Sequence, residues 1–185
     1  EILSFWGGFH GRTGTAMSAA GSIGTKKQWG PLMPGHIYAP YAYCYRCPFA
    51  MKPESCGFHC LGFLDHAMQT ASTGDLAAVI VEPVGPESGT RPVDKNHNAE
   101  IRRLCDKYGA LLIFDEVVTG FRIGLGGAQG YFGVKPDLTI FGKVVAGGYP
   151  SAGGVGGRRD LILLMAAGLE SGKKRAYVGG TLAAN

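Results

Sequence analysis

Continuous apolar segments alternate along the chain with segments of helical periodicity. Residues 2–6, 76–84, 110–117 and 136–143 are largely apolar and are bounded by glycine, proline or charged residues, which predicts a strand in each. The runs at 76–84 and 110–117 show no alternation of apolar and polar positions, which is typical of strands buried on both faces of a sheet. A glycine-rich segment at 151–158 predicts one more strand.

Apolar positions three and four residues apart predict helices at 62–71, 98–109 and 159–169. Residues 13–25 are small and polar, which indicates a short helix or a loop. Residues 29–60 are rich in Pro, Tyr, Gly and Cys, and we expect an irregular excursion there. Strands that alternate with helices predict an α/β fold, with a mainly parallel sheet and helices on both of its faces.

Composition narrows the class of protein. Of the 185 residues, 45% are hydrophobic and 17% are charged, which suits one globular domain or a large part of one. The net charge of +4 is spread along the chain without a basic block, so the sequence gives no case for nucleic-acid binding. No apolar stretch is long enough to span a membrane and no secretory signal is present, so we expect a cytoplasmic protein.

Four of the five cysteines, Cys44, Cys47, Cys56 and Cys60, fall within one short segment. Their C-x2-C…C-x3-C spacing is compatible with a zinc or iron–sulfur centre. The alternative is a tight loop with reduced thiols. The second pair is spaced three apart and the loop is short, so the sequence favours this alternative and no metal.

Three charged residues follow buried strands: Glu82, Asp115 and Lys143. Taken singly, each has an ordinary interpretation as a turn acid, a helix cap or a surface lysine. In a parallel sheet, however, ligands bind beyond the carboxyl ends of the strands, and we expect the three to face one crevice. An amine and an ionised acid in one partly buried site fit pyridoxal phosphate, whose aldehyde takes the lysine and whose pyridinium takes the aspartate.

Longer motifs carry a family resemblance. The segment "LLIFDEVVTGFR", followed by the lysine of "FGKVVAGG", resembles the signature of class III aminotransferases, which are pyridoxal-phosphate enzymes of fold type I. Residues 111–162 are similar to glutamate-1-semialdehyde aminomutases. The segments "FHGRTGTAMSAAGS" and "GPLMPGHIYAPYAYCYRCPF" instead resemble 4-aminobutyrate and related ω-aminotransferases, and "YVGGTLAAN" resembles a Gly-Thr segment that both branches share.

The resemblance implies that residues 1–185 are part of the large, three-layer α/β/α cofactor-binding domain. It places the first cofactor-phosphate loop and the C-terminal small domain outside this range. Lys143 would form an aldimine with the cofactor and then move a proton between substrate and cofactor carbons. Asp115 would bind the pyridine nitrogen, while Val117 and Phe9 would contact the two faces of the ring.

Further roles follow from the same resemblance. Thr181 would reach the cofactor phosphate of the neighbouring subunit, in a homodimer or a dimer of dimers. Glu82 would lie near cofactor and substrate, and His10 would orient its loop by hydrogen bonding. Val118 stands where many ω-aminotransferases carry glutamine, which favours the aminomutase-like branch or an altered site.

The resemblance therefore implies amino-group transfer between an amine or amino acid and an oxo acid or aldehyde, through pyridoxamine phosphate. An intramolecular aminomutase of the glutamate-1-semialdehyde type is the alternative within the same chemistry. The alternative from another class is a non-catalytic fragment organised by metal at the cysteine cluster.

Overall fold

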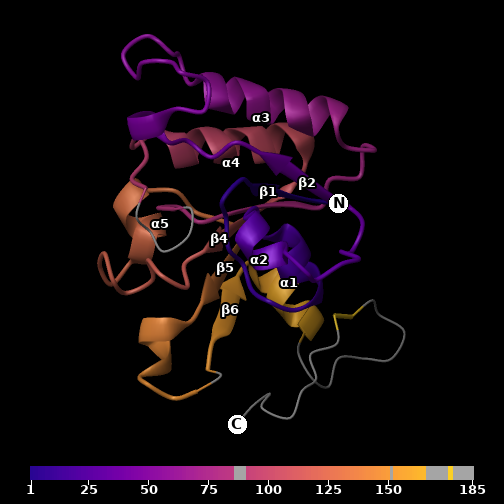
Figure 1. Ribbon diagram of the computed structural model, residues 1–185. Helices are drawn as coiled ribbons and strands as arrows, with labels where there is room; N and C mark the ends of the chain where they lie inside the picture. Colours follow the sequence, from indigo (N-terminus) through magenta and orange to yellow (C-terminus); the bar gives the residue numbers. More distant parts are fainter. Residues whose placement is uncertain (86–90, 151, 166–174, 177–185) are drawn as a thin grey trace.

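The computed structural model describes residues 1–85, 91–150, 152–165 and 175–176 (Figure 1). The described strands form one sheet in the order β2-β1-β3-β4-β5-β6. Neighbours from β2 to β5 pair in parallel, and β6 pairs with β5 in the antiparallel direction. The strands are β1 Ile2–Phe5, β2 His36–Ala39, β3 Ala78–Val81, β4 Leu111–Asp115, β5 Leu138–Phe141 and β6 Gly154–Gly157.

Helices connect the parallel strands, as the alternating pattern predicts. Figure 1 shows α3 and α4 side by side on one face of the sheet and α1 with α2 on the other. Short 3-10 turns extend several connections. The described helices are α1 Gly14–Ala19, α2 Ile23–Lys26, α3 His59–Thr70, α4 His97–Tyr108, α5 Gly127–Phe132 and α6 Arg159–Ile162, and the 3-10 turns are η1 Cys44–Arg46, η2 Lys143–Ala146 and η3 Leu163–Met165.

The main core lies between the sheet and the α3–α4 pair. Successive side chains of a strand point to opposite faces, so alternate residues of each strand meet the helices. Leu64 of α3 and Ile101 of α4 have no exposed side-chain area, which places them at the centre of this layer. Other members of the same cluster are Leu3, Phe5, Leu61, Ala67, Met68, Val79, Val81, Leu104, Leu112 and Phe114.

The predicted fold class is confirmed: this is an α/β fold with a mainly parallel sheet covered on both faces. The prediction that residues 29–60 form only an irregular excursion is wrong, because β2 lies within them. This strand has four residues and buries only every second one, so its apolar signal is weak beside the surrounding prolines and glycines. It pairs with β1 alone and forms the edge of the sheet.

The predicted ends of several elements also change. β3 ends before Glu82, and β5 ends at Phe141 rather than at Lys143, where the 3-10 turn η2 begins. The predicted helix at 159–169 is α6 followed by the turn η3, and its last four positions lie outside the described residues. None of the helices in the described part of the chain combines the length and the apolar composition that a membrane crossing requires.

Candidate functional site

Residues that follow β1, β3, β4 and β5 line one cavity at the carboxyl ends of these strands. Its volume is about 350 Å³. All the predicted site residues that the structure describes are in its wall, and Thr181 lies outside the described residues. The lining residues are Phe9, His10, Gly11, Arg12, Glu82, Asp115, Val117, Val118 and Lys143.

Asp115 ends β4, and its carboxylate is fixed by two hydrogen bonds. Its Oδ1 accepts from the backbone N–H of Val117 at 3.1 Å, and its Oδ2 lies 2.8 Å from Nδ1 of His10. The side chains of Asp115 and His10 are 6% and 2% exposed. A buried carboxylate needs partners of this kind, because an unpaired charge out of water is unfavourable. The strand end therefore presents an oriented acid to the cavity.

Glu82 connects β3 to the loop that follows β1. Its Oε1 accepts the backbone N–H of Phe9 at 2.9 Å, which fixes the start of the Phe9–Arg12 loop. The Tyr41 hydroxyl donates to the backbone oxygen of Glu82 at 2.9 Å and accepts the N–H of Gly85 at 3.1 Å. Burial raises the pKa of Tyr41, so this phenol stays protonated and keeps its donor. Glu82 is thus held by both its side chain and its backbone.

Lys143 begins η2 immediately beyond β5, and its φ of 47° is in the left-handed region. A non-glycine residue there is strained by roughly 1–3 kcal/mol, and such strain gathers at functional sites. The preceding Gly142 packs against Val117: a Cβ at Gly142 would lie 3.2 Å from Val117 Cγ1. The turn that carries the lysine is therefore in close contact with the wall of the cavity.

Sequence reasoning missed Arg12. Its guanidinium carbon lies 5.7 Å from the centre of the Phe9 ring, and the side chain is exposed. Among the described residues no carboxylate is within ion-pair distance of it. In the sequence, Arg12 stands three positions after Phe9 in the same glycine-containing loop. It adds a cation to a cavity that already contains an amine and two acids.

Glu116, the second acid of the Asp–Glu pair, contacts different partners. It is 1% exposed and accepts the backbone N–H groups of Ala128 and Gln129 at 2.6 and 3.1 Å, and the Thr119 hydroxyl at 3.0 Å. Only a residue without a side chain fits at Gly127, where a Cβ would lie 2.4 Å from Glu116 Oε2. Of two adjacent carboxylates, one faces the cavity and the other anchors the start of α5.

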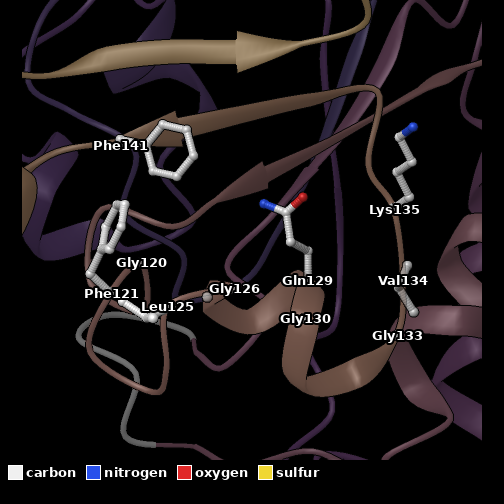
Figure 2. Close-up of a pocket in the computed structure, with 11 residues that line it drawn as sticks. Gly120, Phe121, Leu125, Gly126, Gln129, Gly130, Gly133, Val134, Lys135 and Phe141 are labelled. Carbon is white, nitrogen blue, oxygen red and sulfur yellow. The ribbon is translucent and has the colours of Figure 1, made fainter.

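A second cavity lies beside α5 and is drawn in Figure 2. Its volume is about 480 Å³. Phe121 and Phe141 lie at one end, with ring centres 6.3 Å apart, and Lys135 at the other. None of the predicted site residues is in its wall, and the described lining contains no pair of acid and base. Its size alone does not make it a reaction site.

The four clustered cysteines are free thiols that line one small cavity of about 20 Å³ together with His59. Burial raises the pKa of Cys44 and raises the pKa of Cys60 to about 11, which favours the protonated thiols. Within the described ranges no group of three or more His, Cys, Asp or Glu side chains is arranged to hold a metal ion.

Comparison with known proteins places the chain in a family. Residues 1–185 match the family described as aminotransferase class-III. Over the whole chain, the sequence is 41% identical to a glutamate-1-semialdehyde 2,1-aminomutase from Desulforapulum autotrophicum and 40% identical to one from Roseiflexus castenholzii. The chain spans 39% of the length of each of these curated relatives.

The solved structures point the same way. An (S)-enantioselective ω-transaminase from Thermomicrobium roseum is similar with a TM-score of 0.78 and 33% identity, over 86% of this chain and 36% of that one. A PLP-bound amine transaminase from an uncultivated Pseudomonas species is similar with a TM-score of 0.74 and 32% identity, over 80% of this chain and 34% of that one. The chain therefore belongs to the class III aminotransferases, a family of pyridoxal-phosphate-dependent enzymes.

Proposed function

We propose that the whole protein transfers an amino group between an amine or amino acid and an oxo acid or aldehyde, with pyridoxal phosphate bound in the cavity of Asp115 and Lys143. One observation carries the proposal: a lysine amine and a buried, oriented carboxylate line the same cavity of about 350 Å³. The bound cofactor supplies an aldehyde that reacts with amines and a protonated ring that withdraws electrons from the reacting carbon.

The residues present fit this cofactor. The amine of Lys143 is the group that would hold the aldehyde, and the carboxylate of Asp115 would meet the ring nitrogen as an ion pair. His10 contributes by keeping that carboxylate oriented through its 2.8 Å contact. Phe9 and Val117 supply the apolar walls against which a flat ring packs, and they exclude water from its faces.

Within the reaction we assign the proton transfer to Lys143 and the recognition of acidic substrates to Arg12. With the cofactor bound, the Lys143 Nζ would be the group in the cavity that takes and returns the substrate proton. The exposed guanidinium of Arg12 offers two parallel N–H groups to a substrate carboxylate. Glu82 holds the loop that carries Phe9 and Arg12.

The assembly of the whole protein is part of the same proposal. We place residues 1–185 in the large cofactor-binding domain and Thr181 against the cofactor phosphate of a neighbouring subunit, in a homodimer or a dimer of dimers. The partners in the reaction are a small-molecule amino donor and an oxo acceptor.

The visible spectrum of the complete protein tests the proposal. Protein purified with pyridoxal phosphate should show an absorption band that borohydride removes, and peptide mapping should then find the cofactor on Lys143. Lys143→Ala should lose the covalent label, whereas Lys135→Ala, which changes a lysine of the second cavity, should keep it. A label on another lysine, or no label on the wild-type protein, would contradict the proposal.

An intramolecular aminomutase is the second candidate, because the curated relatives that match the whole chain at 41% and 40% identity are named as aminomutases. In that reaction the amino group returns to the adjacent carbon of the same molecule, and no separate oxo acid is consumed. Turnover that requires an added oxo acid would support the transaminase, and turnover of glutamate-1-semialdehyde without one would support the aminomutase.

A further inference from the structure

A third cavity adjoins the one that holds Asp115 and Lys143. Its volume is about 470 Å³, and it shares Phe9 and Arg12 with the first cavity. It extends from these two side chains over α1 and α2 to Trp29. The two cavities therefore meet at Phe9 and Arg12.

Two side chains in the wall of this third cavity favour the binding of an aromatic ring from a ligand. Met17 is buried, and Trp29 is 64% exposed, so an uncovered indole is available to a ligand. Ser22 and Thr25 bring two hydroxyls, and neither makes a side-chain cap or any other side-chain hydrogen bond within the described residues. The volume of this cavity is in the range of small-molecule sites, and its wall combines apolar side chains with polar ones.

The charge of the cavity is set by Arg12. The described lining contains this guanidinium and no acidic side chain, so an anionic group is favoured at the border with the first cavity. Arginine also lies well against aromatic rings, as its position near Phe9 shows. A carboxylate at Arg12 with an aromatic ring beyond it would satisfy both parts of the wall.

The backbone of the loop that carries Trp29 is held by hydrogen bonds at two points. Its backbone N–H donates to the Lys26 oxygen at 3.1 Å, and the Lys26 ammonium lies 4.1 Å from the centre of the Tyr38 ring. Further along the same loop, the N–H of Met33 donates to the Ser18 hydroxyl at 3.0 Å. A backbone held at both points loses less entropy when a ligand binds, while the indole itself stays exposed.

We propose that this third cavity is the specificity pocket of the enzyme and that it takes the aromatic arm of an amino or oxo acid whose carboxylate meets Arg12. The proposal rests on the proposed function, since it assumes that the reacting end of the molecule lies at Lys143. It predicts a preference for acids with an aryl arm over short-chain acids of the same charge.

Two carboxylates that differ only in the ring test this preference. Calorimetric titration of the complete, cofactor-loaded protein with 4-phenylbutyrate and with butyrate should give an affinity at least about tenfold higher for the aryl acid, from the area buried and the ring contact. Trp29→Ala should remove this advantage and leave the affinity for butyrate unchanged. Trp6→Ala is the matched control, because Trp6 is also a partly exposed indole but packs against Phe63.

A second variant approaches the same pocket by filling it. Thr25→Phe should weaken 4-phenylbutyrate binding at least about tenfold while butyrate still binds, because the added ring occupies the place of the aryl arm. Equal affinities of the two acids for the wild-type protein, or an unchanged ratio in both variants, would overturn the proposal. The cofactor band on Lys143 reports separately on the proposed function, so loss of the aryl preference with the band intact refutes the specificity pocket alone.

Discussion

Asp115 has both of its carboxylate oxygens occupied by groups of the protein itself. The Val117 amide and His10 hold it from two sides, and its remaining accepting capacity faces the cavity. A carboxylate held in this way does not have to reorganise when a cation meets it, and such preorganisation is where most electrostatic catalysis comes from. We therefore expect the electrostatic effect of Asp115 to depend on its two hydrogen bonds, to the Val117 amide and to His10.

Replacing Asp115 by Ala should leave the cofactor loosely bound and lower kcat by several orders of magnitude, because the ring nitrogen loses its ion-pair partner. Equilibrium dialysis of the cofactor and steady-state kinetics measure the two effects. Glu54→Ala, which removes an exposed carboxylate that is not part of the cavity lining, should change neither. Near-normal turnover in the Asp115 variant would refute the assigned role.

Gly142 gives a second test at the scale of one residue. A Cβ there would lie 3.2 and 3.4 Å from the two methyl groups of Val117, so Val117 must move by a few tenths of an ångström. Because φ is −171°, the backbone itself accepts alanine without strain. Gly142→Ala should weaken cofactor binding several-fold through the shifted wall, with Gly130→Ala as the control since nothing lies within 4 Å of a Cβ there.

At the scale of elements, the irregular segment after β4 depends on Glu116. Its carboxylate accepts the Ala128 and Gln129 amides at the start of α5 and the Thr119 hydroxyl. Ala128 and Thr119 are buried, and Gln129 is half-buried. The segment between β4 and α5 includes Val117 and Val118, which line the cavity. A buried acid outside the cavity lining thus keeps part of the cavity wall in position.

Glu116→Ala should lower the free energy of unfolding by about 2–4 kcal/mol, because it leaves several buried donors without an acceptor. Urea denaturation measures the change. Glu100→Ala provides the control: this half-buried acid of α4 pairs with the exposed Arg103 at 2.8 Å, and such surface pairs contribute roughly 0–1 kcal/mol. A loss below 1 kcal/mol in the Glu116 variant would show that the segment does not need this anchor.

The elements also show what the sequence could and could not predict. Long signals were reliable: the buried runs around β3 and β4 and the periodic helices α3 and α4 lie within a few residues of their predicted ranges. The strand β2 was missed because only two of its four residues are buried. Whether two strands pair in parallel or antiparallel, as β6 does with β5, depends on contacts between the strands. The sequence of a single strand therefore does not predict it.

In the candidate site, too, some residues could be predicted from the sequence and others could not. Glu82, Asp115 and Lys143 could be expected to meet, because neighbouring parallel strands bring their carboxyl ends to one edge. The contact between His10 and Asp115 spans 105 positions and could not be read from spacing. Arg12 was missed because an arginine in a glycine-rich loop is most often a solvated surface residue.

At the scale of the whole molecule, we expect His97 to determine how the free energy of unfolding decreases at acidic pH. This residue begins α4 and is 1% exposed, with its ring 5.6 Å from that of Tyr41. Burial lowers its pKa to about 4, although Asn98 and Asp94 act in the opposite direction. The folded protein therefore keeps His97 neutral over a range of pH in which the unfolded chain takes up a proton.

The sign follows from linkage. Above pH 6.5, His97 is neutral in both the folded and the unfolded protein, and it does not lower the free energy of unfolding. As the pH falls from 6.5 to about 4, the unfolded state binds the proton and the folded state does not, so stability decreases by about 3 kcal/mol. Burial acts to raise the pKa of Asp137, but Arg102, Leu112 and Arg158 together hold it below the ordinary value of 3.8. Protonation of Asp137 therefore lowers the stability further only when the pH falls below about 3.8.

Urea midpoints measured between pH 7 and pH 4 should therefore fall for the wild-type protein, and His97→Gln should flatten this dependence even if it lowers stability overall. His66→Gln, on the exposed side of α3, should retain the wild-type slope. A slope that is the same in all three proteins would remove His97 as the group responsible.

The shared border of two cavities limits how this enzyme can be altered. Phe9 and Arg12 belong to both spaces, and Glu82 fastens the loop between them. In the proposed site Phe9 contacts the ring of pyridoxal phosphate, so a change at position 9 aimed at a new substrate would also weaken cofactor binding. Selection for a new substrate and selection for tight cofactor binding would then conflict at this position. Trp29 and Thr25 line only the third cavity and not the cavity of Asp115 and Lys143. Substitutions that change substrate specificity should therefore accumulate at these two positions.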